Sequence, residues 1–269
     1  MLSFLATLNC LLPCFALSNG LPVQSSTSER LEDEFRTLLY VQTPNGSNVL
    51  VTDYVGDPLE PSEVMDYIVT NDAISPYNVR IKNPTRDFNC HSFAWHAQSD
   101  NEIEYWMYHP SLYYQDGSYT QVSSFSSVVP GDKIVYFDSQ GIVLHSGIVS
   151  EVLDGTPNGV CGNSNLVVID SKWGEAGLYK SRGDRTPYTS NNNGTAAYVQ
   201  FYHYNYSHTH AFTLEPTDND DYHLVKCDCT GYYELHTFIN IQLRDEERQD
   251  RYIPARQCTG CGYISYMVY

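Results

Sequence analysis

Cys90 is the residue of this sequence that is best suited to covalent catalysis, because a cysteine thiolate is a strong nucleophile. Asn89 precedes it, and Phe93, Ala94 and Ala97 follow at the spacing of a helical apolar stripe. With Asn89 as N-cap, Cys90 becomes the first residue of a helix, where free backbone N–H groups and the helix dipole lower the thiol pKa. The same N–H groups can stabilise an oxyanion on a carbonyl under attack. A single cysteine is more often a small buried residue, so its partners decide its role.

His145 is the candidate base for such a thiol, because it directly precedes an apolar run that is typical of a strand. An imidazole there could take the thiol proton and return it to a leaving amine. Asp170, at the end of a later strand-like run, could orient the imidazole, although an aspartate that enters a turn is an equally good interpretation. His91 competes as base, but successive helix side chains point about 100° apart, so we expect it to line the cleft beside Asn89.

The elements that must position these residues are strands after a single helix. Strand-like runs cover residues 132–137, 146–152, 166–170 and 197–204, and two earlier ones lie at 38–42 and 49–54. One helix that carries a cysteine, followed by a meander of strands, is an α+β layout.

Three short strings stand in an order that resembles the NlpC and CHAP branches of the papain-like cysteine amidases and endopeptidases. They are Asn-Cys-His-Ser at 89–92, Pro-Gly-Asp at 130–132 and His-Ser-Gly-Ile at 145–148. The resemblance covers residues 80–205 and implies a papain-like core, with the helix of Cys90 packed on an antiparallel sheet. It also implies cleavage of an amide bond in bacterial peptidoglycan without an organic cofactor. Asn89 departs from the Asp or Gln that usually precedes the cysteine in these branches.

The last part of the chain contains two pairs of closely spaced cysteines: Cys227, Cys229, Cys258 and Cys261. The second pair has the C-x-x-C-G form in which a tight turn aims two thiolates at one ion, so the four predict a structural zinc. His223 and His236 flank the first pair and could substitute as ligands. Two disulfides are the alternative, since exported proteins favour them.

Four segments follow from these patterns: a signal peptide at 1–18, an extension at 19–79, a hydrolase domain at 80–205 and a cysteine-rich module at 206–269. The first segment is apolar and ends in small residues, Ala16 and Ser18, which resembles an export cleavage site, although no Lys or Arg precedes the apolar run. We therefore expect a secreted or surface protein.

The charge of the chain limits its partners. A formal net charge of -17 argues against nucleic acid and anionic membrane surfaces, which require basic patches. No segment after the first approaches the roughly 20 apolar residues of a membrane span. Two classes of function remain: a cysteine hydrolase of cell-wall peptides, and a non-catalytic surface or cell-wall-binding protein that uses its cysteine-rich module for recognition.

Overall fold

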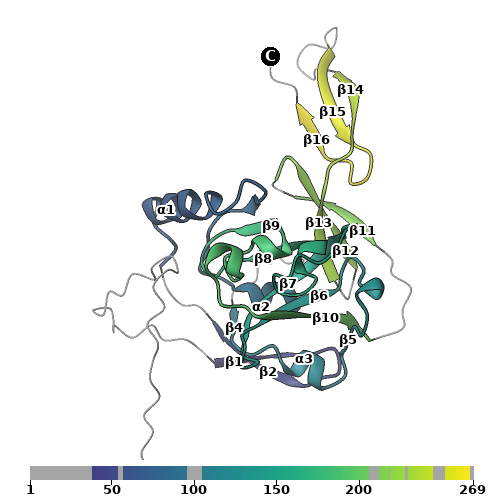
Figure 1. Cartoon of the computed structure of the whole chain (residues 1–269). Coiled ribbons are helices and arrows are strands. Elements are labelled where there is room, and N and C mark those ends of the chain that lie inside the picture. Colours follow the sequence, from purple (N-terminus) through teal and green to yellow (C-terminus); the bar gives the residue numbers. More distant parts are fainter. Residues whose placement is uncertain are drawn as a thin grey trace, which may run out of the picture.

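The computed structural model describes residues 38–53, 57–95, 105–205, 212–217, 219–227, 230–244 and 252–266. The predicted signal peptide and Cys229 lie outside these residues. Within the described residues, sixteen strands form four antiparallel sheets, and three α-helices accompany them (Figure 1).

A seven-stranded sheet forms the centre of the molecule, in the order β3-β9-β8-β7-β6-β10-β5. Its strands are β3 (Val79–Lys82), β5 (Tyr119–Gln121), β6 (Lys133–Phe137), β7 (Val143–Val152), β8 (Val167–Lys172), β9 (Leu178–Arg182) and β10 (Tyr198–Tyr204). All five residues of β6 are buried, because apolar clusters cover both faces of the sheet. Val135 and Phe137 belong to one cluster, and Ile134 and Tyr136 belong to the other.

The helices are α1 (Pro61–Asp72), α2 (Cys90–Trp95) and α3 (Leu112–Gln115). Glu60 and Glu63 form a capping box at the start of α1, where Pro61 suits the first turn. All six residues of α2 are buried, and this helix contacts β7 and β8 on the face of the central sheet that carries Val135 and Phe137.

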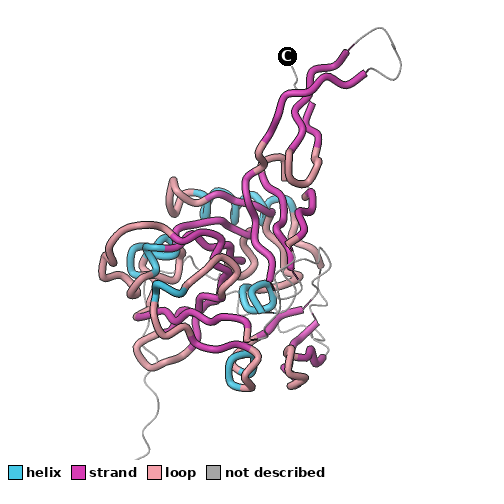
Figure 2. The backbone as a smooth tube through the Cα atoms, turned by 90° about the vertical axis from the view of Figure 1, so that its right-hand side faces the viewer, coloured by secondary structure: helices cyan, strands magenta, loops and turns pink. Residues whose placement is uncertain are grey.

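Three smaller sheets complete the molecule. They contain β1 (Leu38–Gln42), β2 (Asn48–Asp53) and β4 (Tyr105–Met107); β11 (Thr213–Pro216), β12 (Tyr222–Cys227) and β13 (Thr230–Leu235); and β14 (Phe238–Arg244), β15 (Tyr252–Cys258) and β16 (Ile264–Tyr266). The sheet β14–β16, which we call the finger, projects from the rest of the molecule in both views (Figures 1 and 2).

The sheet β11–β13 packs on the central sheet, and its β13 contacts β7. Five of its side chains belong to the same core cluster as Phe93 and Trp95 of α2: Tyr222, Leu224, Val225, Tyr232 and Tyr233. The first part of the predicted 206–269 module therefore shares the core of the central sheet, and the finger alone stands apart from it.

The predicted papain-like α+β fold is wrong. The described residues are dominated by strands in several antiparallel sheets, and two of the three α-helices contain only six and four residues. The strands of residues 206–269 were not predicted because this segment lacks a continuous apolar pattern. They form nevertheless, since they pair with one another and bury aromatic side chains. No helix among the described residues is long and apolar enough to cross a membrane.

Candidate active site and metal-binding group

Asn89 caps helix α2 as its position before Cys90 predicts. Its Oδ1 accepts the backbone N–H of Ser92 at 3.0 Å and the Ser92 hydroxyl at 3.1 Å. Its Nδ2 donates to the carbonyl of Met107 at 2.8 Å, which ties the start of α2 to β4. The side-chain amide of Asn89 therefore makes its hydrogen bonds within the fold. Its role is to position Cys90, and it does not stabilise an oxyanion.

The thiol of Cys90 is buried, with 6% of the residue exposed, at the junction of α2 and β7. Burial raises the pKa of the Cys90 thiol to about 11, although the backbone of Ser146, His91 and Cys90 and the charge of Lys172 favour the thiolate. The sulfur is therefore a protonated thiol at neutral pH, near groups that favour negative charge.

His145 is fully buried, and its ring stacks on Tyr188 with 3.9 Å between the centroids. It lies opposite Tyr136 in the β6–β7 pairing and contacts that ring on the same face of the sheet. Neither ring nitrogen has a hydrogen-bond partner among the described residues, so the predicted bond to the Cys90 sulfur is not formed. Burial lowers the pKa of His145 well below its usual range, with a contribution from nearby His91.

Ser146 is the β7 side chain that faces α2. Its hydroxyl lies 2.9 Å from His91 Nδ1 and accepts the indole N–H of Trp95 at 3.0 Å. Side chains alternate across a strand, so His145 points toward the opposite face. Burial lowers the pKa of His91 to about 4, and His109 acts in the same direction. His91, predicted to line the cleft, is therefore a neutral buried group bonded to β7.

Asp170 does not orient His145. Its carboxylate pairs with Lys180 on β9 at 2.8 Å and accepts the backbone N–H of Tyr233 on β13 at 2.6 Å. Burial raises the pKa of Asp170, against the charge and hydrogen bond of Lys180. The carboxylate joins β8 to two other strands, which is a structural role.

Lys172, at the end of β8, was missed as a site residue. It is fully buried, and its Nζ donates to the carbonyls of Thr85, Gly174 and Ala176 at 2.9, 2.5 and 2.5 Å. Its charge acts on the Cys90 thiol. The signal was a lysine between the apolar residues 167–169 and Trp173, at the end of a strand-like run, since a lysine that is buried there needs partners for its charge.

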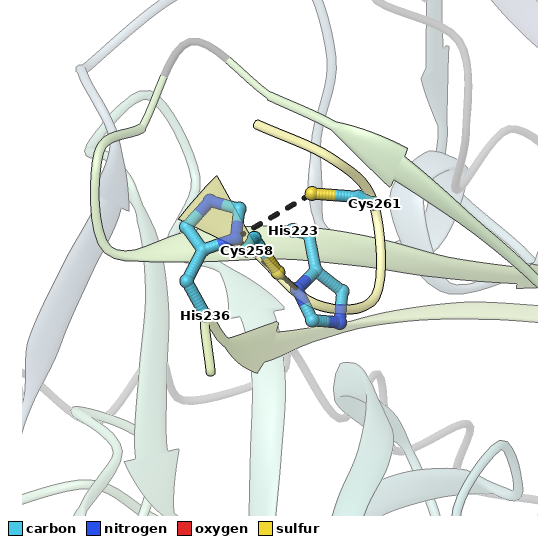
Figure 3. Close-up of side chains that lie close together, drawn as sticks. All are labelled: His223, His236, Cys258 and Cys261. Carbon is cyan, nitrogen blue, oxygen red and sulfur yellow. Dashed lines mark hydrogen bonds between the residues drawn. The ribbon is translucent and has the colours of Figure 1, made fainter. Parts of the chain in front are cut away.

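A second group of reactive side chains lies where β11–β13 meets the finger (Figure 3). It contains His223 on β12, His236 after β13, Cys258 at the end of β15 and Cys261 in the following turn. One ligand atom from each lies within 4.8 Å of all the others, so the group could hold a metal ion.

The four ligand atoms are turned toward one another. His223 Nδ1 lies 3.3 Å from His236 Nδ1 and 3.7 Å from Cys258 Sγ, and His236 Nδ1 lies 3.6 Å from Cys261 Sγ. Partial burial disfavours the Cys258 thiolate, but hydrogen bonds from the Cys261 and Gly260 backbones and from His236 lower its pKa to about 6. Cys258 and Cys261 are free thiols, so they do not form the alternative disulfide.

This group differs from the predicted set of four cysteines. Cys227 is not a member, and Cys229 lies outside the described residues. The flanking histidines His223 and His236 take their places. The carboxylate of Glu234 lies 3.8 Å from His223 Nε2, where it can orient the imidazole as acidic neighbours of metal ligands do.

Comparisons of the chain with protein-family models, with curated proteins and with solved structures found no match. The likeness to the NlpC and CHAP branches therefore depends on the three strings at 89–92, 130–132 and 145–148.

Proposed function

We propose that the chain is a cysteine hydrolase that cleaves amide bonds, with Cys90 as nucleophile and His145 as base. One observation carries the proposal: among the described residues neither ring nitrogen of fully buried His145 has a partner, and helix α2 with Cys90 packs on the strand that bears this histidine. A buried polar atom without a partner costs about 1–3 kcal/mol, so its retention calls for a function. An imidazole that can turn toward a thiol is suited to proton transfer.

In the proposed reaction the Cys90 sulfur attacks the carbonyl carbon of the amide, and His145 takes the thiol proton. The backbone N–H groups of Cys90 and Ser146, which favour the thiolate, are the donors assigned to the oxyanion that forms. His145 then protonates the leaving amine, and water hydrolyses the thioester. The imidazole must leave its stack on Tyr188 to reach the sulfur, so substrate binding has to reorganise this contact. The chemistry does not require a papain-like fold, since the same constellations occur on unrelated folds.

The substrate class is a peptide of bacterial peptidoglycan, which an exported protein would reach. It is implied by the strings at 89–92, 130–132 and 145–148. The test is release of new amino groups from purified peptidoglycan. We expect Cys90→Ala and His145→Gln to lower this release about 10³-fold or more, whereas exposed His109→Gln retains it. Turnover by His145→Gln at the rate of the unsubstituted chain would overturn the proposal.

We also propose that zinc is the metal of the group formed by His223, His236, Cys258 and Cys261. Two sulfurs and two nitrogens in tetrahedral array are a typical zinc site. Bonds of about 2.0–2.3 Å place tetrahedral ligands about 3.6 Å apart. The neighbouring ligand atoms lie 3.3, 3.6 and 3.7 Å apart, which fits an ion of this size. The role supported is structural, since the ligands come from two sheets.

Metal analysis of the purified protein tests this assignment. We expect one zinc per chain, lost in Cys258→Ser and in His236→Ala. Cys227→Ser is the matched control, because Cys227 lies on β12 outside the group and should leave the zinc content unchanged. A chain that keeps its zinc in Cys258→Ser, or loses it in Cys227→Ser, contradicts the ligand set.

A further inference from the structure

A buried ammonium lies next to the proposed nucleophile. Lys172 has no measurable exposure, and all three N–H donors of its ammonium are matched by three backbone carbonyls, those of Thr85, Gly174 and Ala176. The face of the Phe88 ring lies 5.3 Å from Nζ. These contacts fix the ammonium in one place.

No carboxylate of the described residues lies within ion-pair distance, 4.0 Å, of Lys172 Nζ, whereas the fully buried carboxylates of Asp170 and Asp184 each have a cationic partner. Lys180, one strand away, pairs with Asp170 at 2.8 Å. Burial lowers the pKa of Lys172 to about 7, against the charges of Glu175, Cys90 and Asp87. A buried cation without a carboxylate partner gains most from an anion that forms nearby, and the Cys90 thiol can supply one.

The same ammonium fixes the chain that leads to the nucleophile. Residues 83–89 belong to no strand or helix, so their position relative to β7 depends on individual hydrogen bonds. The Thr85 carbonyl accepts from Lys172, and the Thr85 N–H donates to the Glu175 carbonyl at 3.0 Å. Both bonds attach this segment to the turn between β8 and β9, four residues before Asn89 caps α2.

We propose that Lys172 is a positioning residue for Cys90: it holds residues 85–89, and with them the sulfur, against β7, and its positive charge stabilises the thiolate that attacks the substrate. This inference rests on the proposed function of Cys90. It accounts for a buried lysine that the packing of β8 does not require.

The test measures the rate of Cys90 alkylation by iodoacetamide from pH 6 to 11, with the labelled peptide identified by mass spectrometry. We expect Lys172→Met, which keeps the length of the side chain without its charge, to lower the rate at pH 6.5, where Lys172 still carries its proton, about tenfold. Lys172→Gln retains two donors for the carbonyls without the charge, and should lower this rate as well. It also serves if the methionine variant does not fold. Unchanged rates at pH 6.5 in the variants that fold would overturn the proposal.

Lys180→Met is the matched control, because it removes a partly buried lysine from the adjacent strand without a contact to residues 85–89. A structural loss alone would alter thermal unfolding in both lysine variants, but only Lys172→Met should lower the alkylation rate at pH 6.5. The readout also separates this inference from the proposed function. A lowered rate in a protein that hydrolyses no peptidoglycan supports the role of Lys172 and refutes the hydrolase, whereas an active enzyme with an unchanged rate does the reverse.

Discussion

Two buried side chains, Trp95 and His91, meet at the hydroxyl of Ser146. Trp95 donates its indole N–H to this oxygen, and Nδ1 of His91 lies 2.9 Å from it. A positive charge on His91 would lie in a site without solvent, and this desolvation, together with the effect of His109, lowers the pKa of His91 to about 4.

This lowered pKa predicts acid sensitivity. Between pH 6.5 and about 4 the unfolded chain binds a proton at His91 that the folded chain does not, so stability is complete above pH 6.5 and falls as the pH decreases. At pH 5 the loss from His91 is about 2 kcal/mol. Urea unfolding gives the free energy of unfolding at pH 7.5 and at pH 5.0. Between these pH values His91→Gln should lose less stability than the unsubstituted chain, by about this amount.

His145 contributes a loss of the same sign in both proteins, so the comparison isolates His91. If the two pH values give the same difference for His91→Gln and the unsubstituted chain, His91 is not the buried neutral group described here.

At the scale of elements, β13 is joined to the central sheet by polar bonds as well as by apolar packing. Asp170 of β8 accepts the N–H of Tyr233, and fully buried Lys133 of β6 donates to Thr230 at 3.0 Å. Thr230 in turn donates to the carbonyl of Gly131. The sheet β11–β13 is therefore a layer of the central domain, whereas the finger contacts it through the metal-binding group.

This arrangement predicts different outcomes for two truncations. A chain that ends at Thr237 loses the finger and Cys258 and Cys261, but keeps the core and should unfold cooperatively. A chain that ends at Asn205 loses five buried side chains of β12 and β13, worth about 10 kcal/mol as an upper estimate, which matches the whole stability of a typical domain. We expect it to be unfolded or aggregated, as judged by circular dichroism and thermal melting. Equal folding of both chains would contradict a shared core.

At the scale of the whole molecule, two chemically distinct centres lie on one β-rich framework. The candidate active site lies where α2, β7 and β8 meet, and the metal-binding group lies where β11–β13 meets the finger (Figures 1 and 3). The strand β13 contacts β7 and precedes His236, so it connects the two regions. The proposed zinc would fix the base of the finger, while the hydrolysis would depend on residues around β7.

Much of the local structure could be predicted from the sequence. The strand-like runs at 132–137, 146–152, 166–170 and 197–204 correspond to β6, β7, β8 and β10, and those at 38–42 and 49–54 correspond to β1 and β2. The cap of Asn89 on α2 is also present. These features depend on neighbours in the chain, through apolar runs and short-range hydrogen bonds.

The sequence by itself therefore determined where six of the strands run, that Cys90 opens a helix and that the tail gathers thiols beside histidines. The tertiary structure alone decided the face to which each side chain points. A shift of one residue in register reverses that face, and the β6–β7 pairing is irregular between Tyr136 and Phe137, opposite the start of β7. It also decided the partners of Asp170, Lys172 and Cys258, because these partners lie on other strands or in distant loops, and no local pattern encodes such contacts.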